Sequence, residues 1–158
     1  MVQIRRATVD DAELIAQLVK PVHDIHVAAQ PDFFKPYALS DELIADFRQR
    51  LLDPLNTFLI AEADGEAVGY VFAQVIERPD NLYSYASRYL LVDQISVNPE
   101  ARSKRYGEAL MQAVFDLAKL LELPRVMLGV WAFNQRAIAF YERLGFAPRD
   151  TRMEVDLG

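Results

Sequence analysis

Three positive side chains lie within four residues: Arg102, Lys104 and Arg105. They follow a predicted strand that ends before Pro99, and a long helix is expected to begin at about Lys104. The free N–H groups and the positive dipole end of a helix start attract anions, and these side chains add to that field. The pattern predicts an anion site, although a solvated basic patch is the alternative interpretation.

A second group has the spacing Asn134-x-x-Ala137-x-x-x-Tyr141-x-x-x-Gly145-Phe146. Asn134 suits a helix N-cap, and Gly145 suits the left-handed position that ends a helix. Tyr141 lies inside the expected helix. The sequence contains neither the G-x-x-x-x-G-K-S/T loop of phosphate-binding NTPases nor a G-x-G-x-x-G dinucleotide motif.

Composition excludes several classes of function. The chain has no cysteine, so thiolate metal sites, disulfides and a cysteine nucleophile are excluded. Its two histidines do not form a metal-binding pattern, and we expect no metal. A net charge of −6 argues against bulk nucleic-acid binding. No apolar run approaches the roughly 20 residues of a membrane helix, so we expect a cytoplasmic protein without a membrane partner.

These residues are positioned by a mixed order of elements, β-α-α-β-β-β-α-β-α-β, within one domain covering residues 1–158. The order predicts an α+β fold with a mostly antiparallel twisted sheet and about four helices. Pro21 should kink or break the first helical region. The expected strands are Val2–Arg6, Thr57–Ala63, Ala67–Ile76, Tyr89–Val97, Arg125–Trp131 and Phe146–Val155. The expected later helices are Asp41–Leu52, Lys104–Leu121 and Gln135–Leu144.

Together, the two motifs resemble those of the GNAT superfamily of acetyl-CoA-dependent N-acetyltransferases. The first has an apolar-x-Val-x-Pro strand end, then Arg102-x-x-x-x-Gly107, then a helix with Ala-Leu-Met. The second has the family's last helix and its Gly-Phe exit. The element order agrees from Val2 to Val155. One position departs: Arg105 stands where the family usually has glycine, which would cost about 1–2 kcal/mol if the backbone there were left-handed.

The resemblance implies a coenzyme A site on these elements. Backbone N–H groups of the loop would hold the diphosphate, and main-chain groups of the preceding strand would pair with the pantetheine arm. A bulge is expected in that strand. Asn134 would bond the arm, act as a helix N-cap, or do both. The implied cofactor-binding residues are Ile95, Ser96, Val97, Arg102, Ser103, Lys104, Arg105, Tyr106, Gly107, Glu108 and Asn134.

The resemblance also implies catalytic roles. Tyr141 would be the general acid beside the sulfur, and the alternative is a core tyrosine. Asp93 would be the base, directly or through water, and the alternative is a solvent-facing carboxylate. The acceptor side would include His26, Phe33 and Tyr83, although these side chains could instead serve only to bury their own loops.

The expected activity is direct transfer of an acetyl or longer acyl group from acetyl-CoA to a primary amine of a small molecule or peptide. No cysteine is present to carry the acyl group, which favours a ternary complex. The alternative is a non-catalytic acyl-CoA-binding or sensing module of the same fold, motivated by Arg105. A homodimer through the final strand or a sheet edge is left open.

Overall fold

The computed structural model describes all 158 residues, and its centre is a five-stranded sheet in the order β1-β2-β3-β4-β5. β1 (Val2–Arg6), β2 (Asn56–Ala63), β3 (Glu66–Arg78) and β4 (Ser87–Val97) are antiparallel neighbours, and β5 (Val126–Leu128) runs parallel to β4. The mixed α+β class predicted from the sequence is therefore confirmed.

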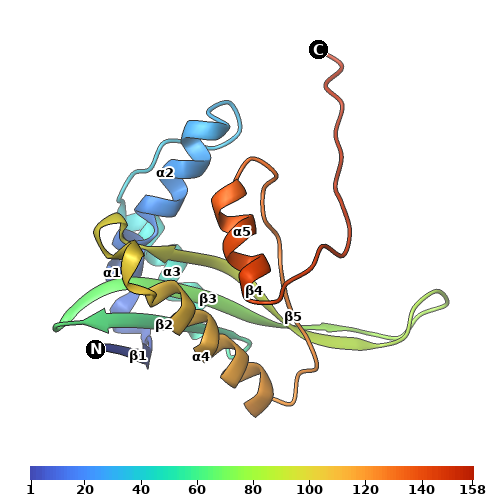
Figure 1. Cartoon of the computed structure of the whole chain (residues 1–158), viewed down its shortest axis with the longest axis horizontal. Coiled ribbons are helices and arrows are strands. Elements are labelled where there is room, and N and C mark those ends of the chain that lie inside the picture. Colours follow the sequence, from blue (N-terminus) through green and yellow to red (C-terminus); the bar gives the residue numbers. More distant parts are fainter.

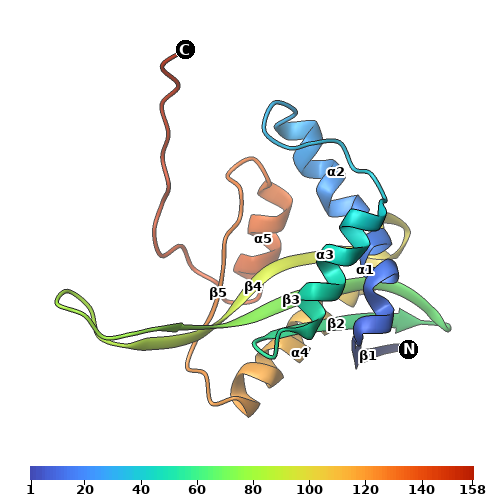
Figure 2. The same cartoon turned by 180° about the vertical axis from the view of Figure 1, so that it is seen from behind.

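Helices cover both faces of the sheet (Figures 1 and 2). α1 (Ala12–Leu18) and α3 (Asp41–Leu52) lie on one face, and α4 (Tyr106–Leu120) lies on the other. Both views show α2 (Lys20–Ala29) and α5 (Gln135–Arg143) standing beyond the β4 side of the sheet. Two short 3₁₀ segments, Val9–Asp11 and Pro99–Lys104, precede α1 and α4.

Each face has its own apolar core. On the α1/α3 side, Ile15, Phe47, Phe58 and Tyr70 are almost fully buried. On the α4 side, alternate residues of the same strands meet the apolar stripe of α4, which is formed by Leu110, Met111, Val114 and Ala118. The sheet therefore buries both of its faces, in agreement with the two-sided apolar pattern of β3.

Local sequence signals position most of the chain reversals. The Ser40 hydroxyl accepts a hydrogen bond from the Leu43 N–H and begins α3 at the predicted residue. Asp64 and Gly65 both have positive φ, 53° and 81°, as a tight hairpin between β2 and β3 requires. The first helical region breaks at Val19, two residues before Pro21, so the expected break is confirmed.

The prediction of a final strand over Phe146–Val155 was wrong for the single chain. Residues 145–158 belong to no helix or strand, and in both views this C-terminal segment runs away from the rest of the molecule. The alternation of apolar and polar residues favoured a strand, but within the chain no neighbouring strand pairs with the segment. A strand needs such a neighbour to satisfy its backbone.

Two further element boundaries differ from those predicted from the sequence. The helix expected from Lys104 begins at Tyr106, because Arg105 has left-handed backbone and Pro99–Lys104 forms a 3₁₀ turn. The strand expected over Arg125–Trp131 shortens to Val126–Leu128, because its pairing with β4 ends there. No helix in the structure is both long and apolar enough to cross a membrane.

Candidate active site

The site begins where β4 and β5 part. The parallel ladder joins Leu90 to Val126, Leu91 to Met127 and Val92 to Leu128, and then it stops. On its other side, β4 continues to pair with β3 as far as Val97. The backbone groups of residues 93–97 that point toward β5 therefore have no neighbouring strand. We call this stretch the open β4 edge.

A β-bulge lies at the point of parting. The β3–β4 register passes from Phe72↔Gln94 to Ala73↔Val92, which leaves Asp93 without an opposite residue. The bulge expected from the resemblance is therefore present, and Asp93 is the extra residue. A bulge bends its strand and increases the local twist. This distortion explains why β4 pairs with β5 before Asp93 and not after it.

At the far end of the open β4 edge, the backbones of β3 and β4 lie very close together. Gly69 in β3 is the partner of Val97, and a Cβ atom added to Gly69 would lie 2.6 Å from the Ser96 carbonyl oxygen. Ser96 itself is buried, and its hydroxyl is the one buried side-chain polar atom without a hydrogen-bond partner. This end of β4 is thus fixed firmly against β3 while its opposite edge stays free.

The chain then turns into the basic loop. Arg102 Nε donates a 3.3 Å hydrogen bond to the Val97 carbonyl oxygen. Arg105 has φ 63° and ψ 22°, its side chain is exposed, and its Nε lies 3.3 Å from Glu108 Oε2. No side chain caps α4, whereas Ser40 and Asn134 cap α3 and α5. The first N–H groups of α4 therefore remain available to an anion.

Arg136 adds a second guanidinium at this place, which the sequence analysis missed. Burial, together with the nearby positive charge of Arg136, lowers the pKa of Arg102 below its usual value. Neither arginine forms an ion pair within the chain. The nearby carboxylate of Glu100 acts in the opposite direction but more weakly. Two like charges repel each other, and an anion between them would relieve the remaining repulsion. Arg136 directly follows Gln135 at the start of α5, so the sequence signal was a cation in the first turn of a helix.

Gly107 brings α4 and α5 together. A Cβ atom at Gly107 would lie 3.3 Å from Phe140 Cζ, so the two helices approach closely at the start of α4. Phe140, Ile95 and Val97 pack against the same apolar cluster. The packing therefore places α5 and the open β4 edge against one apolar cluster and joins the two motifs that lie apart in the sequence.

Tyr141 follows Phe140 on α5 and is half-buried. Its ring lies 5.4 Å from that of Phe140 and 5.7 Å from that of Phe146. Burial raises the pKa of Tyr141 to about 12. The phenol therefore keeps its proton throughout the neutral range and can donate a hydrogen bond.

Asp93 lies near the side-chain hydrogen bond between Tyr70 and Gln94. The Tyr70 hydroxyl donates this hydrogen bond to Gln94 Oε1. Burial, and to a smaller extent the charge of Asp93, raises the pKa of Tyr70. The Asp93 side chain itself is exposed to solvent. A carboxylate in this position can accept a proton directly or through water, and the sequence analysis did not include Gln94 or Tyr70.

His26 belongs to an aromatic cluster with Phe33, Phe34, Trp131 and Phe133. Its ring lies 5.1 Å from Phe34 and 5.7 Å from Phe133, and Trp131 lies 5.3 Å from Phe34. The cluster joins α2 and its following loop to the loop before α5. Its members are adjacent in space but lie about a hundred residues apart, so the sequence analysis named His26 and Phe33 but not Trp131 or Phe133.

The tautomer of His26 follows from its hydrogen bond. Nδ1 lies 2.7 Å from the Val22 carbonyl oxygen, which can only accept, so Nδ1 carries the proton. In the neutral ring Nε2 is then an acceptor.

Tyr83 is 96 % exposed near the tip of the long β3–β4 hairpin, which projects away from α2 and α5 (Figure 1). The structure does not bring Tyr83 together with the other predicted site residues.

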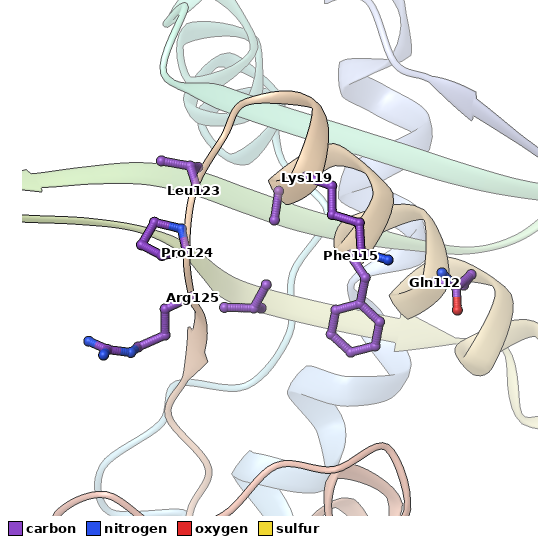
Figure 3. A pocket seen from close by; sticks show the side chains of 8 residues that line it. Gln112, Phe115, Lys119, Leu123, Pro124 and Arg125 are labelled. Carbon is purple, nitrogen blue, oxygen red and sulfur yellow. The ribbon is translucent and has the colours of Figure 1, made fainter.

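One hollow lies outside this site and shares no lining residue with it. It has a volume of about 370 Å³ and lies between α4 and the chain leading into β5 (Figure 3). No group of three or more histidine or carboxylate side chains is arranged to hold a metal ion.

Comparisons with known proteins agree on one family. Residues 21–146 match the family model described as Acetyltransferase (GNAT) family. A Mycobacterium tuberculosis protein named as an uncharacterized N-acetyltransferase is 33 % identical over 79 % of this chain and 74 % of its own length. A mycothiol acetyltransferase of Acidimicrobium ferrooxidans is 31 % identical over 67 % of this chain. This chain spans only 32 % of that longer relative.

Solved structures share the fold. A mutant of the BH1408 protein from Bacillus halodurans superposes with a TM-score of 0.90 at 26 % identity, covering 98 % of this chain and 99 % of that one. The aminoglycoside acetyltransferase AAC(6')-Iy, bound to a bisubstrate analog of coenzyme A, superposes with a TM-score of 0.78 at 20 % identity. The alignment covers 99 % of this chain and 97 % of that enzyme, and it supports the fold alone.

The left-handed backbone of Arg105 predicts a difference between two substitutions. Arg105→Gly and Arg105→Ala both remove the contact with Glu108, but only glycine tolerates φ 63° without strain. We expect Arg105→Gly to be more stable than Arg105→Ala by about 1 kcal/mol, after allowing for the greater chain entropy of glycine. Urea unfolding measures the difference. Equal stabilities, or a more stable alanine variant, would contradict the assigned strain.

Proposed function

The chain belongs to the acetyltransferase (GNAT) family, and from that premise we propose that it transfers an acetyl group from acetyl-CoA to a primary amine of a small molecule or peptide. One observation carries the proposal. A free strand edge at residues 93–97 leads from the uncapped start of α4 toward α5, which bears Tyr141.

The donor fits this arrangement by charge and by hydrogen bonding. The diphosphate would bind the N–H groups from Ser103 to Glu108, with Arg102 and Arg136 on either side. The amide groups of the pantetheine arm would pair with the open β4 edge as an added strand, using the main chain of Ile95, Ser96 and Val97. Asn134 caps α5 through Ala137 N–H at 3.2 Å and retains a side-chain NH₂ group for the arm.

The proposed reaction is a direct transfer from the thioester to the amine, without an acyl-enzyme. The amine nitrogen attacks the thioester carbonyl carbon, the carbon–sulfur bond breaks, and the proton lost by nitrogen ends on sulfur. Asp93, directly or through water, would accept the proton that an incoming ammonium must lose. Tyr141 would donate a hydrogen bond to the developing thiolate. Its raised pKa suits a donor that stabilises the sulfur rather than one that ionises itself.

The acceptor side is aromatic. The wall formed by the cluster of His26, Phe33, Phe34, Trp131 and Phe133 favours an amine carried beside an apolar or aromatic group. Trp131 and Phe33 are 39 % and 69 % exposed, so their faces are available to such a group or, through cation–π attraction, to its ammonium. His26 Nε2 would then accept a hydrogen bond from the acceptor.

Thiol release from acetyl-CoA tests the function against a panel of primary amines that includes aromatic amines, amino sugars and peptides. We expect acceptor-dependent release, highest for amines beside apolar or aromatic groups. Tight acetyl-CoA binding without release for any amine would instead favour the non-catalytic acyl-CoA-binding module. Arg105, which replaces the family glycine, motivates that second candidate.

Replacing Tyr141 with phenylalanine tests the donor to sulfur. We expect kcat to fall by about 10²-fold, the lower end of general-acid contributions, while acetyl-CoA binding changes little. Tyr85→Phe on the exposed hairpin loop is the matched control and should retain full activity.

The pH dependence of kcat checks the environment of Tyr141, because an ordinary tyrosine is half ionised at about pH 10. With its pKa raised to about 12, Tyr141 stays protonated there. A kcat that falls near pH 10 in the wild type, but not in Tyr141→Phe, would contradict this environment.

Arg136→Gln tests the second guanidinium at the diphosphate. Charge-assisted hydrogen bonds contribute about 1.5–3 kcal/mol, so we expect at least about a tenfold weaker Kd for acetyl-CoA by titration calorimetry. Arg143→Gln removes the same charge at the opposite end of α5 and serves as the control. Equal effects of the two substitutions would show that only the overall charge matters.

A further inference from the structure

Gln94 lies on the open β4 edge, directly after Asp93. Its side chain is on the α1/α3 face of the sheet, because it forms a hydrogen bond with Tyr70, whose ring belongs to the core on that side. α2 packs against β4 and carries His26 of the aromatic cluster. The residue after the proposed base therefore belongs to the strand that contacts the helix of the aromatic wall.

Tyr70 fixes the orientation of the Gln94 amide. The Tyr70 side chain is fully buried, and burial raises its pKa, so the phenol keeps its proton. A buried O–H group needs a hydrogen-bond acceptor, and Gln94 Oε1 is that acceptor. An amide accepts through its oxygen and donates through its nitrogen. The contact with Tyr70 therefore uses the oxygen and leaves the two N–H groups of Nε2 for another partner.

The next side chain on this face of β4 does not use those N–H groups. Ser96 lies opposite Tyr70 and is buried, and its hydroxyl has no hydrogen-bond partner. The charge of Asp93 acts on the Tyr70 phenol, which places the carboxylate near the same group. Asp93 and Gln94 are adjacent residues, with Cα atoms about 3.8 Å apart. A proton acceptor and an N–H donor are therefore neighbours on the open β4 edge.

We propose that Gln94 selects the amine substrate by donating a hydrogen bond from Nε2 to an oxygen on the carbon next to the amine-bearing carbon. The substrate class, which rests on the acetyl transfer proposed above, is then primary amines with a neighbouring carbonyl or hydroxyl oxygen. Amino-acid amides, peptide N-termini and amino alcohols belong to this class. The nitrogen would face Asp93, the oxygen would face Gln94, and an apolar remainder would contact the aromatic cluster.

An amine without such an oxygen is disfavoured for a physical reason. It would displace water from the N–H groups of Gln94 and offer no acceptor in return. A donor left without a partner on binding costs free energy, whereas a matched oxygen restores the lost hydrogen bond. The amide therefore acts by discriminating between amines and takes no part in the proton transfers.

Three amines that share a benzyl group test this selection. Phenylalaninamide carries a carbonyl oxygen at the relevant position, phenylalaninol carries a hydroxyl, and phenethylamine carries neither. Thiol release from acetyl-CoA gives kcat/KM for each, and the readout is the ratio of each oxygen-bearing amine to phenethylamine. The basicity of each amine is the same with every protein variant, so a change in this ratio between variants reports the contact with the protein.

Gln94→Glu is the main variant, because it keeps an oxygen for the Tyr70 hydroxyl but replaces the donating NH₂ group with a second oxygen. We expect the ratio for at least one oxygen-bearing amine to fall about three- to tenfold, the range of one uncharged hydrogen bond. Gln94→Leu removes the donor without adding charge and should lower the same ratio. Gln17→Glu adds the same charge at an exposed position of α1 and is the control, which should leave the ratio unchanged.

Each outcome decides one question. A fall for phenylalaninamide alone identifies a carbonyl as the bound oxygen, and a fall for phenylalaninol alone identifies a hydroxyl. Ratios that are equal in the wild type, Gln94→Glu and Gln94→Leu would overturn the selection and leave acetyl transfer intact. Absence of thiol release with every amine of the wider panel would overturn the proposed function and the selection together. Circular dichroism of each variant checks that the fold is retained.

Discussion

Pairing between β4 and β5 lasts for three residue pairs and then ends, and the rest of the site depends on that ending. An extra residue, Asp93, bends β4 where the two strands part. From there to Val97 the main chain keeps β3 on one side and no strand on the other. Unpaired backbone groups are costly unless something satisfies them, so this edge is suited to a ligand that carries amides of its own.

In the loop after β4, a charged residue occupies a strained backbone position. Arg105 occupies left-handed backbone, where glycine would be relaxed, and its side chain extends into solvent beside Glu108. The chain as a whole carries a net charge of −6, yet Arg102, Lys104, Arg105 and Arg136 are concentrated near the uncapped start of α4. Local strain and local repulsion of this kind are typical of functional sites, where the bound ligand provides the compensation. Gly107 completes the arrangement by letting α5 approach closely enough to share one core with Ile95 and Val97.

Features set by neighbouring residues could be predicted from the sequence. Ser40 caps its helix, Asp64-Gly65 forms its hairpin, and Gly145 takes φ 97° after α5, because each depends on local backbone chemistry. Contacts between residues that lie far apart in the sequence could not be predicted from local patterns. Trp131 and Phe133 meet Phe34 and His26 only after folding, and the proximity of Arg136 to Arg102 depends on how α5 packs. Tyr83 looked equivalent to Phe33 as an aromatic loop residue, but the length of the β3–β4 hairpin carries it away. The final strand has the right pattern but no pairing partner within its own chain.

We propose that the open β4 edge receives the pantetheine arm of acetyl-CoA. Hydrogen–deuterium exchange with and without acetyl-CoA measures this directly, because it reports the protection of individual backbone segments. We expect slower exchange across residues 93–97 and across Ser103–Glu108, with little change in the distant β3–β4 hairpin tip. Acetyl-CoA binding that leaves exchange at residues 93–97 unchanged would show that the arm does not pair with this edge.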